Sequence, residues 1–388
     1  MNDNHFDFIV VGAGIAGASI GAHLARRGRV LILEGESQPG YHTTGRSAAL
    51  FSTIYGNALV RALSRASRDF LFQPPSKFTD VALVHPRATL FFALAGQLEL
   101  LHAARADADV RNSTRLLDAE AVAQLLPAFV PGYVAGGIIE DASADIDVHA
   151  LHQGYLRAAR RLGAALVTSQ PVRALSRKGD LWHVQVPAGE FSAPIVVNAA
   201  GAWGDEIARL AGAAPLGLQP LRRTAMVIDT PSGLRPDDWP AAIAVDESFY
   251  FRPEAGRLLL SPADETPSEP CDAQPEEWDV AVAVDHFEHA VGQPVARVLR
   301  RWAGLRVFTP DRSPVAGFDP LVPGLFWFVG QGGYGIQMAE GLALAGAALA
   351  CGEPLPAMLA EHDVRLEDLL PTRPSLRRPP EQVQSPNP

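Results

Sequence analysis

A glycine-rich turn near the start of the chain has the residue types and spacing that bind a dinucleotide. The run Gly12–Ala13–Gly14–Ile15–Ala16–Gly17 matches the pattern G-x-G-x-x-G, follows an apolar stretch and opens an expected helix. Its glycines permit a tight turn and close backbone approach, so that a pyrophosphate can lie at the helix N-terminus. The next apolar stretch, RVLILE, ends at Glu34 and Gly35 follows; the Glu34 carboxylate can accept hydrogen bonds from ribose hydroxyls. This context predicts a dinucleotide site, and an ordinary turn with an exposed glutamate is the alternative.

The polar segment GYHTTGRSAALFSTIYG, residues 40–56, favours FAD over a nicotinamide dinucleotide. Its hydroxyls, its guanidinium and its backbone donors come soon after Glu34, where they can hold the pyrophosphate and ribityl chain of a flavin. A nicotinamide enzyme does not need a second polar loop that runs on toward a substrate pocket. A solvated turn would explain the glycines but not the apolar run that follows. The cofactor contacts expected here are Thr43, Thr44, Gly45, Arg46, Ser47 and Ala48.

Later segments have the same small-residue character. The stretch VVNAAGAW (196–203) ends an apolar strand in small residues, which allow backbone to pack beside a cofactor. The stretch GQGGYGIQ (330–337) precedes a helix, whose N-terminal dipole can stabilise the negative charge of a reduced flavin; a flexible strand–helix turn is the alternative. The cofactor contacts expected from these two stretches are Ala200, Gly201, Gly332, Gly333, Tyr334, Gly335, Ile336 and Gln337. Val172, which follows Pro171, begins a short β segment whose backbone could contact an adenine.

Glycine-ended apolar strands occur at the start, middle and end of the chain, and strands of alternating polarity lie between them. A chain of 388 residues exceeds one minimal core. The pattern predicts an α/β protein in which a discontinuous nucleotide-binding domain is interrupted twice by a β-rich second domain. The expected boundaries are 1–75, 141–220 and 321–370 for the first domain, 76–140 and 221–320 for the second, and 371–388 for a disordered, proline-rich tail.

Composition excludes several classes of partner. The formal net charge of −10 argues against a nucleic-acid partner. Cys271 and Cys351 have no metal-ligand spacing and lie outside the flavin-contacting motifs, so we expect no metal site and non-covalent FAD. No stretch is apolar enough to span a bilayer, and the N-terminus lacks the features of a signal peptide. We therefore expect a cytoplasmic protein without an integral membrane segment.

About residues 5 to 365 resemble the FAD-dependent D-amino-acid oxidase/dehydrogenase (DAO) superfamily. The segments most similar to its D-arginine dehydrogenase branch are GYHTTGRSAA, DIDVHALHQGYLR, VVNAAGAW, LGLQPLRR, DESFY, WAGLR and GQGGYGIQ. The resemblance implies a Rossmann-like, glutathione-reductase-like FAD domain and an α+β substrate domain whose mixed, largely antiparallel sheet covers the flavin. It also implies hydride transfer from a substrate C–N bond to flavin N5, followed by hydrolysis of the imine to a 2-oxo acid and ammonia.

The same resemblance places two arginines at the substrate carboxylate. Arg223 in PLRRT and Arg306 in AGLRVF match carboxylate-binding positions of the branch, and guanidinium groups pair with carboxylates through two hydrogen bonds. A structural ion pair is the alternative for each. Arg306 is the better candidate, because an unpaired charge is costly on an apolar strand. Arg222 and Arg223 are neighbours on a β segment and should point to opposite faces, so only one can serve the site.

Further pocket residues follow from the branch. Tyr55 and Tyr250 match substrate-contacting tyrosines, with a place in the core as the alternative, and Gln337 and the Gly333 backbone match groups near the flavin and the substrate amine. His42, His149 and His152 are candidates for a base by type only, and no general base is assigned.

Two positions depart from the branch. A glutamate that reads the substrate guanidinium is replaced by Thr89, and a histidine by Leu50. Without that carboxylate the pocket disfavours a buried guanidinium.

The predicted activity is therefore oxidative deamination of neutral, hydrophobic D-amino acids in preference to D-arginine. The electron acceptor, dioxygen or a quinone-like compound, is not fixed by the sequence. One alternative is oxidation of an N-alkylated, sarcosine-like or L-configured acid. Another is an FAD-holding subunit without turnover, although a carboxylate clamp would serve no purpose there.

Overall fold

Three separated parts of the chain supply one parallel sheet, as the glycine-ended strands predict. The computed structural model describes residues 4–377 and places six strands in the order β20-β21-β13-β1-β2-β9. All neighbours are parallel except the pair β20 and β21. The bounds are β1 (Phe8–Val11), β2 (Val30–Leu33), β9 (Ala165–Val167), β13 (Ile195–Asn198), β20 (Val315–Phe318) and β21 (Leu325–Val329).

Alternate side chains of this sheet pack into two different layers. Phe8 and Val10 of β1 join the core formed with helices, whereas Ile9 and Val11 join the core formed with an antiparallel sheet. Both faces are therefore covered, as a parallel sheet requires. The covering elements are the helices α1 (Ile15–Leu24), α6 (Val148–Arg161) and α9 (Ala339–Ala350) on one face, and the strands β10 (Ala174–Lys178), β11 (Leu181–Val186) and β12 (Gly189–Ala193) with α7 (Gly204–Leu210) on the other.

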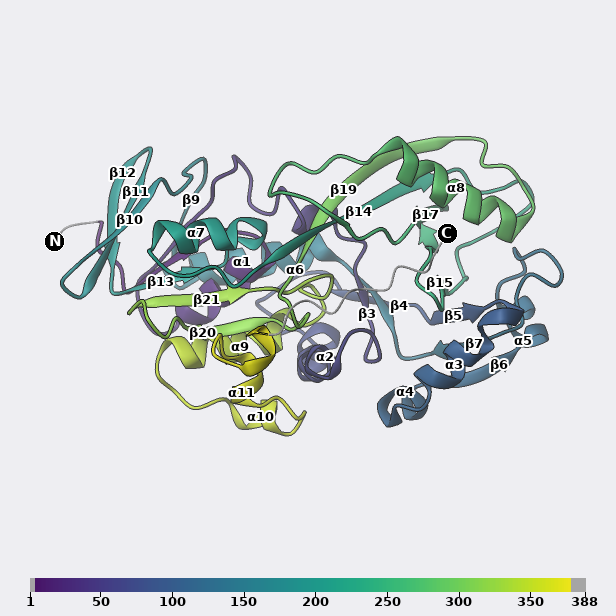
Figure 1. Ribbon diagram of the computed structural model, residues 1–388, viewed down its shortest axis with the longest axis horizontal. Helices are drawn as coiled ribbons and strands as arrows, with labels where there is room; N and C mark the ends of the chain where they lie inside the picture. Colours follow the sequence, from purple (N-terminus) through teal and green to yellow (C-terminus); the bar gives the residue numbers. More distant parts are fainter. Residues whose placement is uncertain (1–3, 378–388) are drawn as a thin grey trace.

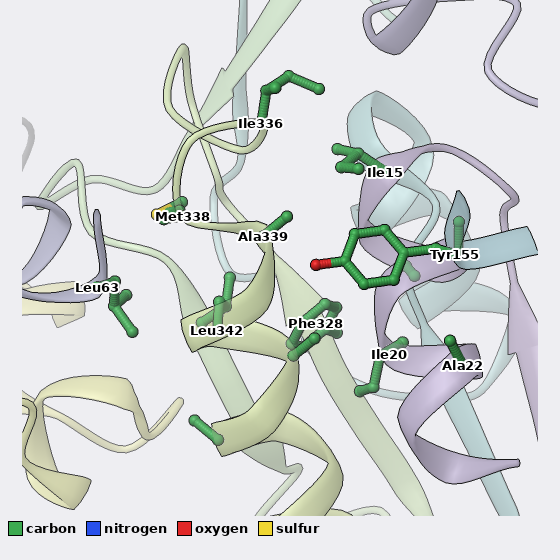
Figure 2. Packing of buried hydrophobic residues seen from close by; sticks show 14 of the residues in the cluster. Ile15, Ile20, Ala22, Leu63, Tyr155, Phe328, Ile336, Met338, Ala339 and Leu342 are labelled. Carbon is green, nitrogen blue, oxygen red and sulfur yellow. The ribbon is translucent and has the colours of Figure 1, made fainter. Parts of the chain in front are cut away.

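Figure 2 shows how the helical layer closes around Tyr155. This side chain extends from α6 toward the start of α9, beside Ile15 of α1. Its hydroxyl donates to Glu340 at 2.8 Å, and the same carboxylate oxygen lies 3.1 Å from Nε2 of His23. Burial, together with the nearby Glu340 carboxylate, raises the pKa of Tyr155 well above its ordinary value. One buried carboxylate thus links the three helices.

The second large sheet is mixed and largely antiparallel, as expected. Its order is β18-β14-β17-β16-β15-β5-β7-β6, and β19 pairs along the other part of β14. Only β5 and β15 run parallel. The bounds are β5 (Thr89–Ala93), β6 (Arg115–Asp118), β7 (Gly136–Glu140), β14 (Gln219–Ile228), β15 (Ala241–Ala244), β16 (Tyr250–Glu254), β17 (Arg257–Ser261), β18 (Thr266–Pro267) and β19 (Val298–Phe308).

Figure 1 shows β14 and β19 as long neighbouring strands that run between the two halves of the molecule. Helix α8 covers the second sheet. A small sheet, β3-β8-β4, lies between the halves and carries the start of the 50–55 segment. The remaining elements are β3 (Leu50–Phe51), β4 (Val84–Pro86), β8 (Ala144–Ile146), α2 (Ala58–Phe72), α3 (Leu98–Ala104), α4 (Ala108–Ser113), α5 (Ala119–Leu125), α8 (Glu277–Val291), α10 (Ala357–Ala360) and α11 (Leu366–Leu369), with short 3-10 turns at Thr44–Arg46, Ala95–Gln97, Gly201–Trp203 and Pro374–Arg377.

Two boundaries differ from the sequence-based expectation. Strand β20 pairs with β21 and belongs to the first sheet, although the boundary was expected at residue 321. The tail was expected to be disordered from residue 371, which is wrong for residues 371–377. Arg373 is 6% exposed, and its Nε and Nη2 donate to Asp311 at 2.6 and 2.9 Å. The proline-rich composition predicted disorder here, but the ion pair between Arg373 and Asp311 holds residues 371–377 against the rest of the protein. The rest of the expected tail lies outside the described residues.

None of the helices within residues 4–377 combines the length and the hydrophobicity that a membrane span requires.

We predict that Arg373→Ala lowers the free energy of unfolding by about 3–5 kcal/mol, because it leaves the Asp311 carboxylate, whose side chain is only 13% exposed, without its cation. Burial opposes ionisation of Asp311, but hydrogen bonds from Arg373 and Ser375 outweigh it and lower the pKa to about 2. A lowered pKa stabilises the fold above the unfolded-state value and loses this effect as the pH falls. Urea unfolding should therefore show the full difference above about pH 4 and a shrinking one toward pH 2.

The matched control for this prediction is Arg365→Ala. Arg365 pairs with Asp368 at 3.0 Å, but 67% of its side chain is exposed, so the expected loss is below about 1 kcal/mol. Equal losses in the two variants would contradict the anchoring role of Arg373.

Candidate active site

A cavity of about 690 Å³ lies where the two large sheets meet. The first sheet contributes Val11, Leu33 and Val329, each the last residue of its strand. Ligands of open α/β sheets bind at these carboxyl ends of the strands. The second sheet contributes residues of β5, β14, β15, β16 and β19. The cavity therefore has one wall suited to a nucleotide and a second wall of different chemistry.

The glycine-rich turn is built against the neighbouring strands. Gly12 has a φ of +102°, and a Cβ added there would lie 2.5 Å from the carbonyl oxygen of Ala199, so a side chain at this position is both strained and blocked. The Glu34 carboxylate accepts the Ala13 N–H at 2.8 Å and the Glu36 N–H at 2.9 Å. These bonds fix the carboxylate at the rim of the turn, and its expected contact with ribose hydroxyls stays a prediction.

The 43–46 part of the polar segment connects the turn to the second sheet. The Thr44 hydroxyl accepts the Ile15 N–H at 2.9 Å, and the Thr43 hydroxyl donates to the Leu305 carbonyl at 2.7 Å. Arg46 donates to the carbonyls of Ala273 and Ala303 at 2.9 and 3.0 Å and pairs with Asp272. The Arg46 guanidinium is thus engaged by protein acceptors, and its expected contact with the cofactor stays a prediction.

Most residues predicted to contact the cofactor line this one cavity. Those in its wall are Gly12, Gly14, Ile15, Ala16, Glu34, Gly35, Thr43, Thr44, Arg46, Ser47, Ala48, Val172, Ala200, Gly201, Gly332, Gly333, Gly335, Ile336 and Gln337. Three predicted contacts are absent from that wall: Gly17, Gly45 and Tyr334. Tyr334 instead lines a neighbouring cavity of about 500 Å³ and packs edge-on against Tyr55.

Arg306 supplies the positive charge in the second wall. Within residues 4–377 it forms no ion pair with a carboxylate, and its Nη1 donates to the Tyr55 hydroxyl at 3.3 Å. Burial disfavours its charge, but the oxygens of Tyr55 and Tyr250 outweigh burial and raise the arginine pKa further above its ordinary value. Arg306 therefore stays cationic, and its guanidinium can bind an anion in the cavity.

The glycine loop after β21 packs against Arg306. The Gly332 N–H donates to the Val307 carbonyl at 2.8 Å, which joins the loop to β19. A Cβ on Gly333 would lie 2.8 Å from Cζ of Arg306, so only glycine lets the guanidinium lie on this backbone. The loop thereby places the guanidinium at the cavity wall.

The two adjacent arginines of β14 have different surroundings, as predicted. Arg222 points away from the cavity and pairs with Glu276 and, at 2.9 Å, with Asp279. Arg223 lines the cavity, but its Nε donates to the Asp264 carbonyl at 2.7 Å and its Nη2 lies 3.3 Å from Glu265. Arg223 is therefore partly neutralised by protein groups, and Arg306 is the freer cation.

Other predicted pocket residues come together here. Leu50, Tyr55, Thr89 and Tyr250 all line the cavity. The Thr89 hydroxyl and Nε2 of Gln337 are buried and have no hydrogen-bond partner among the described residues. Buried polar groups are rarely left unsatisfied, so these two atoms indicate a ligand.

Sequence reasoning missed several residues that shape the site. Phe91 and Glu247 line both cavities. Glu140 is fully buried behind Ser52 and Thr53. Strand periodicity can indicate that a residue faces inward, but it does not reveal which partner an inward carboxylate meets.

Comparison with known proteins identifies the family. Residues 7–349 match the family model described as "DAO: FAD dependent oxidoreductase", and the chain belongs to this family. It is 25% identical to the uncharacterized oxidoreductase YurR of Bacillus subtilis, over 92% of this chain and 98% of that protein. It is 24% identical to mitochondrial dimethylglycine dehydrogenase of Mus musculus, over 86% of this chain but only 41% of that protein.

The solved structures agree with the fold. Glycine oxidase from Geobacillus kaustophilus superposes with a TM-score of 0.79 at 22% identity, over 90% of this chain and 96% of the other. The predicted α/β class and the superfamily are confirmed, whereas the D-arginine dehydrogenase branch gains no support from these relatives.

FAD is the cofactor of this family, and the cavity fits it. The N-terminus of α1, the Glu34 carboxylate and the small residues Ala200 and Gly201 form a cradle of the kind that a dinucleotide requires. The unsatisfied Nε2 of Gln337 offers a further donor at the same cavity.

His152 of α6 supports the glycine-rich turn of this cradle. Its Nε2 lies 2.8 Å from the Ala13 carbonyl, and its ring contacts the position of Gly40. Burial lowers the pKa of His152, so the ring is neutral at pH 7. A carbonyl only accepts hydrogen bonds, so Nε2 must carry the proton.

We predict that His152→Leu weakens FAD binding about tenfold, because the glycine-rich turn loses a buried hydrogen bond. Flavin retained after gel filtration and the Kd from flavin fluorescence would measure the effect. His149→Leu, on the same helix, is the control and should retain FAD like the wild type. Unchanged retention in His152→Leu would exclude the supporting role.

Proposed function

We propose that this protein is an FAD-dependent oxidoreductase that oxidises the C–N bond of a small, carboxylate-bearing amino acid, with N-alkylated, sarcosine-like acids as the main substrate class. The observation that carries the proposal is Arg306, a cation in the wall of the FAD cavity without a carboxylate partner among residues 4–377. A guanidinium in this setting pairs favourably with a substrate carboxylate.

The neighbours of Arg306 support the same assignment. Tyr55 accepts a hydrogen bond from it, and the Gly333 backbone lies against it. Arg223 assists as a second, weaker positive charge, because Glu265 already engages it. On this proposal the second sheet forms the substrate domain and the first sheet forms the FAD domain, within the boundaries given above apart from β20.

The rest of the wall favours a neutral substrate. Leu50, Phe91, Ala225 and Ile243 are apolar and Thr89 is uncharged, so that Glu247 is the acidic side chain in this part of the wall. One relative, dimethylglycine dehydrogenase, is named for an N-methylated glycine. This similarity favours an N-alkylated acid over a primary D-amino acid.

The reaction follows from the positions of these groups. Bound FAD supplies the acceptor for the hydride, and the C–N bond becomes a C=N bond as the amine loses its proton. Arg306 and Tyr55 hold the carboxylate and so fix the α-carbon relative to the cofactor, which is the orientation that catalysis requires. Tyr250 closes the pocket beside them. Water then hydrolyses the imine to an amine and a carbonyl compound.

A second candidate is oxidation of neutral, hydrophobic D-amino acids. The apolar residues Leu50 and Ile243 leave room for an aliphatic side chain. Both candidates share the carboxylate site, and they differ in whether the nitrogen or the α-carbon carries the alkyl group.

We predict that anaerobic addition of N-methylglycine or N,N-dimethylglycine bleaches the flavin absorbance of the holoprotein, and that D-arginine does not. D-Leucine, D-methionine and L-leucine complete the panel, with an artificial dye as electron acceptor. Faster bleaching by the D-amino acids would favour the second candidate. If no amino acid bleaches the flavin, the enzymatic assignment fails and the FAD-holding alternative stands.

We further predict that Arg306→Met raises KM at least about 100-fold, because two charge-assisted hydrogen bonds to the carboxylate are lost. Steady-state kinetics with the best substrate of the panel would measure this. Arg222→Met is the matched control, since Arg222 lies on the neighbouring strand with its side chain away from the cavity, and it should keep KM within about threefold of the wild type. Similar KM values in both variants would contradict the carboxylate role of Arg306.

A further inference from the structure

Glu140 is a buried carboxylate that the proposed chemistry does not use. It ends β7, opposite Thr89 of β5, and its relative exposure is 0%. Within residues 4–377 no arginine, lysine or histidine forms an ion pair with it. Burying a carboxylate without a cation is costly unless hydrogen bonds replace the lost water. The neighbouring Asp141, by contrast, is exposed and pairs with Arg115 at 2.8 Å.

Among the described residues, the hydrogen bonds to the Glu140 carboxylate all come from one short segment. Its Oε2 accepts the Ser52 hydroxyl at 2.6 Å, and its Oε1 accepts the backbone N–H and the hydroxyl of Thr53 at 2.8 and 2.7 Å. The Ser52 hydroxyl also accepts the Ile54 N–H at 3.3 Å. Glu140 therefore fixes both the backbone and the side chains of the segment that continues to Tyr55.

The fixed segment in turn orients Gln337. The Ser52 N–H donates to Oε1 of Gln337 at 3.1 Å. A backbone N–H can only donate, so this bond determines which end of the amide is oxygen. The amide nitrogen Nε2 must then point away from Ser52. Gln337 is 3% exposed, lines the cavity, and its Nε2 has no partner among the described residues.

We propose that Glu140 is a positioning residue which, through Ser52 and Thr53, holds the Gln337 amide so that its Nε2 donates to an acceptor oxygen of the ligand bound in the cavity. That oxygen belongs either to the flavin ring or to the carboxylate of the substrate. The inference rests on FAD binding, which the family establishes. The alternative in which Nε2 donates to the substrate carboxylate also rests on the proposed function. Glu140 touches neither ligand and acts only through the 52–53 segment.

The test compares Glu140→Gln, Gln337→Leu and the double variant as holoproteins. Glu140→Gln replaces one acceptor of the carboxylate by a donor and so disturbs the Ser52 bond. Two signals need no turnover: the absorbance spectrum and midpoint potential of bound FAD, and the Kd of benzoate, used as a carboxylate probe. If Nε2 serves the flavin, both single variants shift the spectrum and lower the potential. If it serves the substrate carboxylate, both raise the benzoate Kd about tenfold.

The double variant separates positioning from general destabilisation. Residues that act through one contact are not additive, so the double variant should change the affected signal no further than Gln337→Leu alone. Asp279→Asn is the matched control, because it neutralises another buried carboxylate outside the cavity wall. It should leave flavin and benzoate signals unchanged.

Three results would overturn the proposal: additive effects in the double variant, an Asp279→Asn variant that shows the same changes, or a Glu140→Gln variant whose flavin and benzoate signals match the wild type. If Glu140→Gln does not fold, the pair Ser52→Ala and Thr53→Val decides, because it removes both hydroxyl bonds to Glu140 and leaves only the bond from the Thr53 N–H. Wild-type signals in this variant would then reject the role. A failure of the substrate panel leaves the flavin signals interpretable, so the two proposals fail separately.

Discussion

One strand sets the geometry of the site, because β19 is bonded on both sides to different parts of the molecule. It pairs with β14 in the second sheet, while its Val307 carbonyl accepts the Gly332 N–H of the glycine loop that follows the first sheet. The Leu305 carbonyl accepts the Thr43 hydroxyl from the polar segment. Arg306 lies between these two carbonyls in sequence, so its position relative to the cofactor wall is fixed by backbone hydrogen bonds rather than by its own flexible side chain.

Charge in the cavity is distributed unevenly, and this unevenness creates the binding site. Glu265 engages both Arg223 and Arg312, at 3.3 and 2.9 Å, while among residues 4–377 the side chain of Arg306 has only the phenol of Tyr55 as a hydrogen-bond partner. A cation that is partly removed from water and lacks a counter-ion is destabilising in the free protein. A carboxylate ligand relieves that cost, so the arrangement favours anion binding at one defined point.

Most residues that the sequence predicts as cofactor contacts line one cavity, because their placement depends on local rules. A strand that ends in glycine before a helix is typical of a nucleotide site. Gly12, Glu34 and Gly333 all line the cavity, as this sequence pattern predicts. The alternation of Arg222 and Arg223 followed from strand geometry alone. The pairing of β20, the anchoring of Arg373 and the role of Glu140 depend on partners far away in the chain, such as Asp311 or Ser52, and no local pattern encodes these partners. The D-arginine branch rested on short motifs, and the relatives found give it no support.

The discontinuity of the first sheet also determines when the molecule can become functional during synthesis. Phe8 pairs with Ile195, and Val196 in turn pairs with Leu325. The glycine-rich turn therefore leaves the ribosome long before the strands beside it exist, and the glycine loop at 330–337 follows later still. Domains generally fold as units during translation. Here the first apolar strands stay without their partners until residues 195–198 and 325–329 are made, and only then can the FAD cavity be complete.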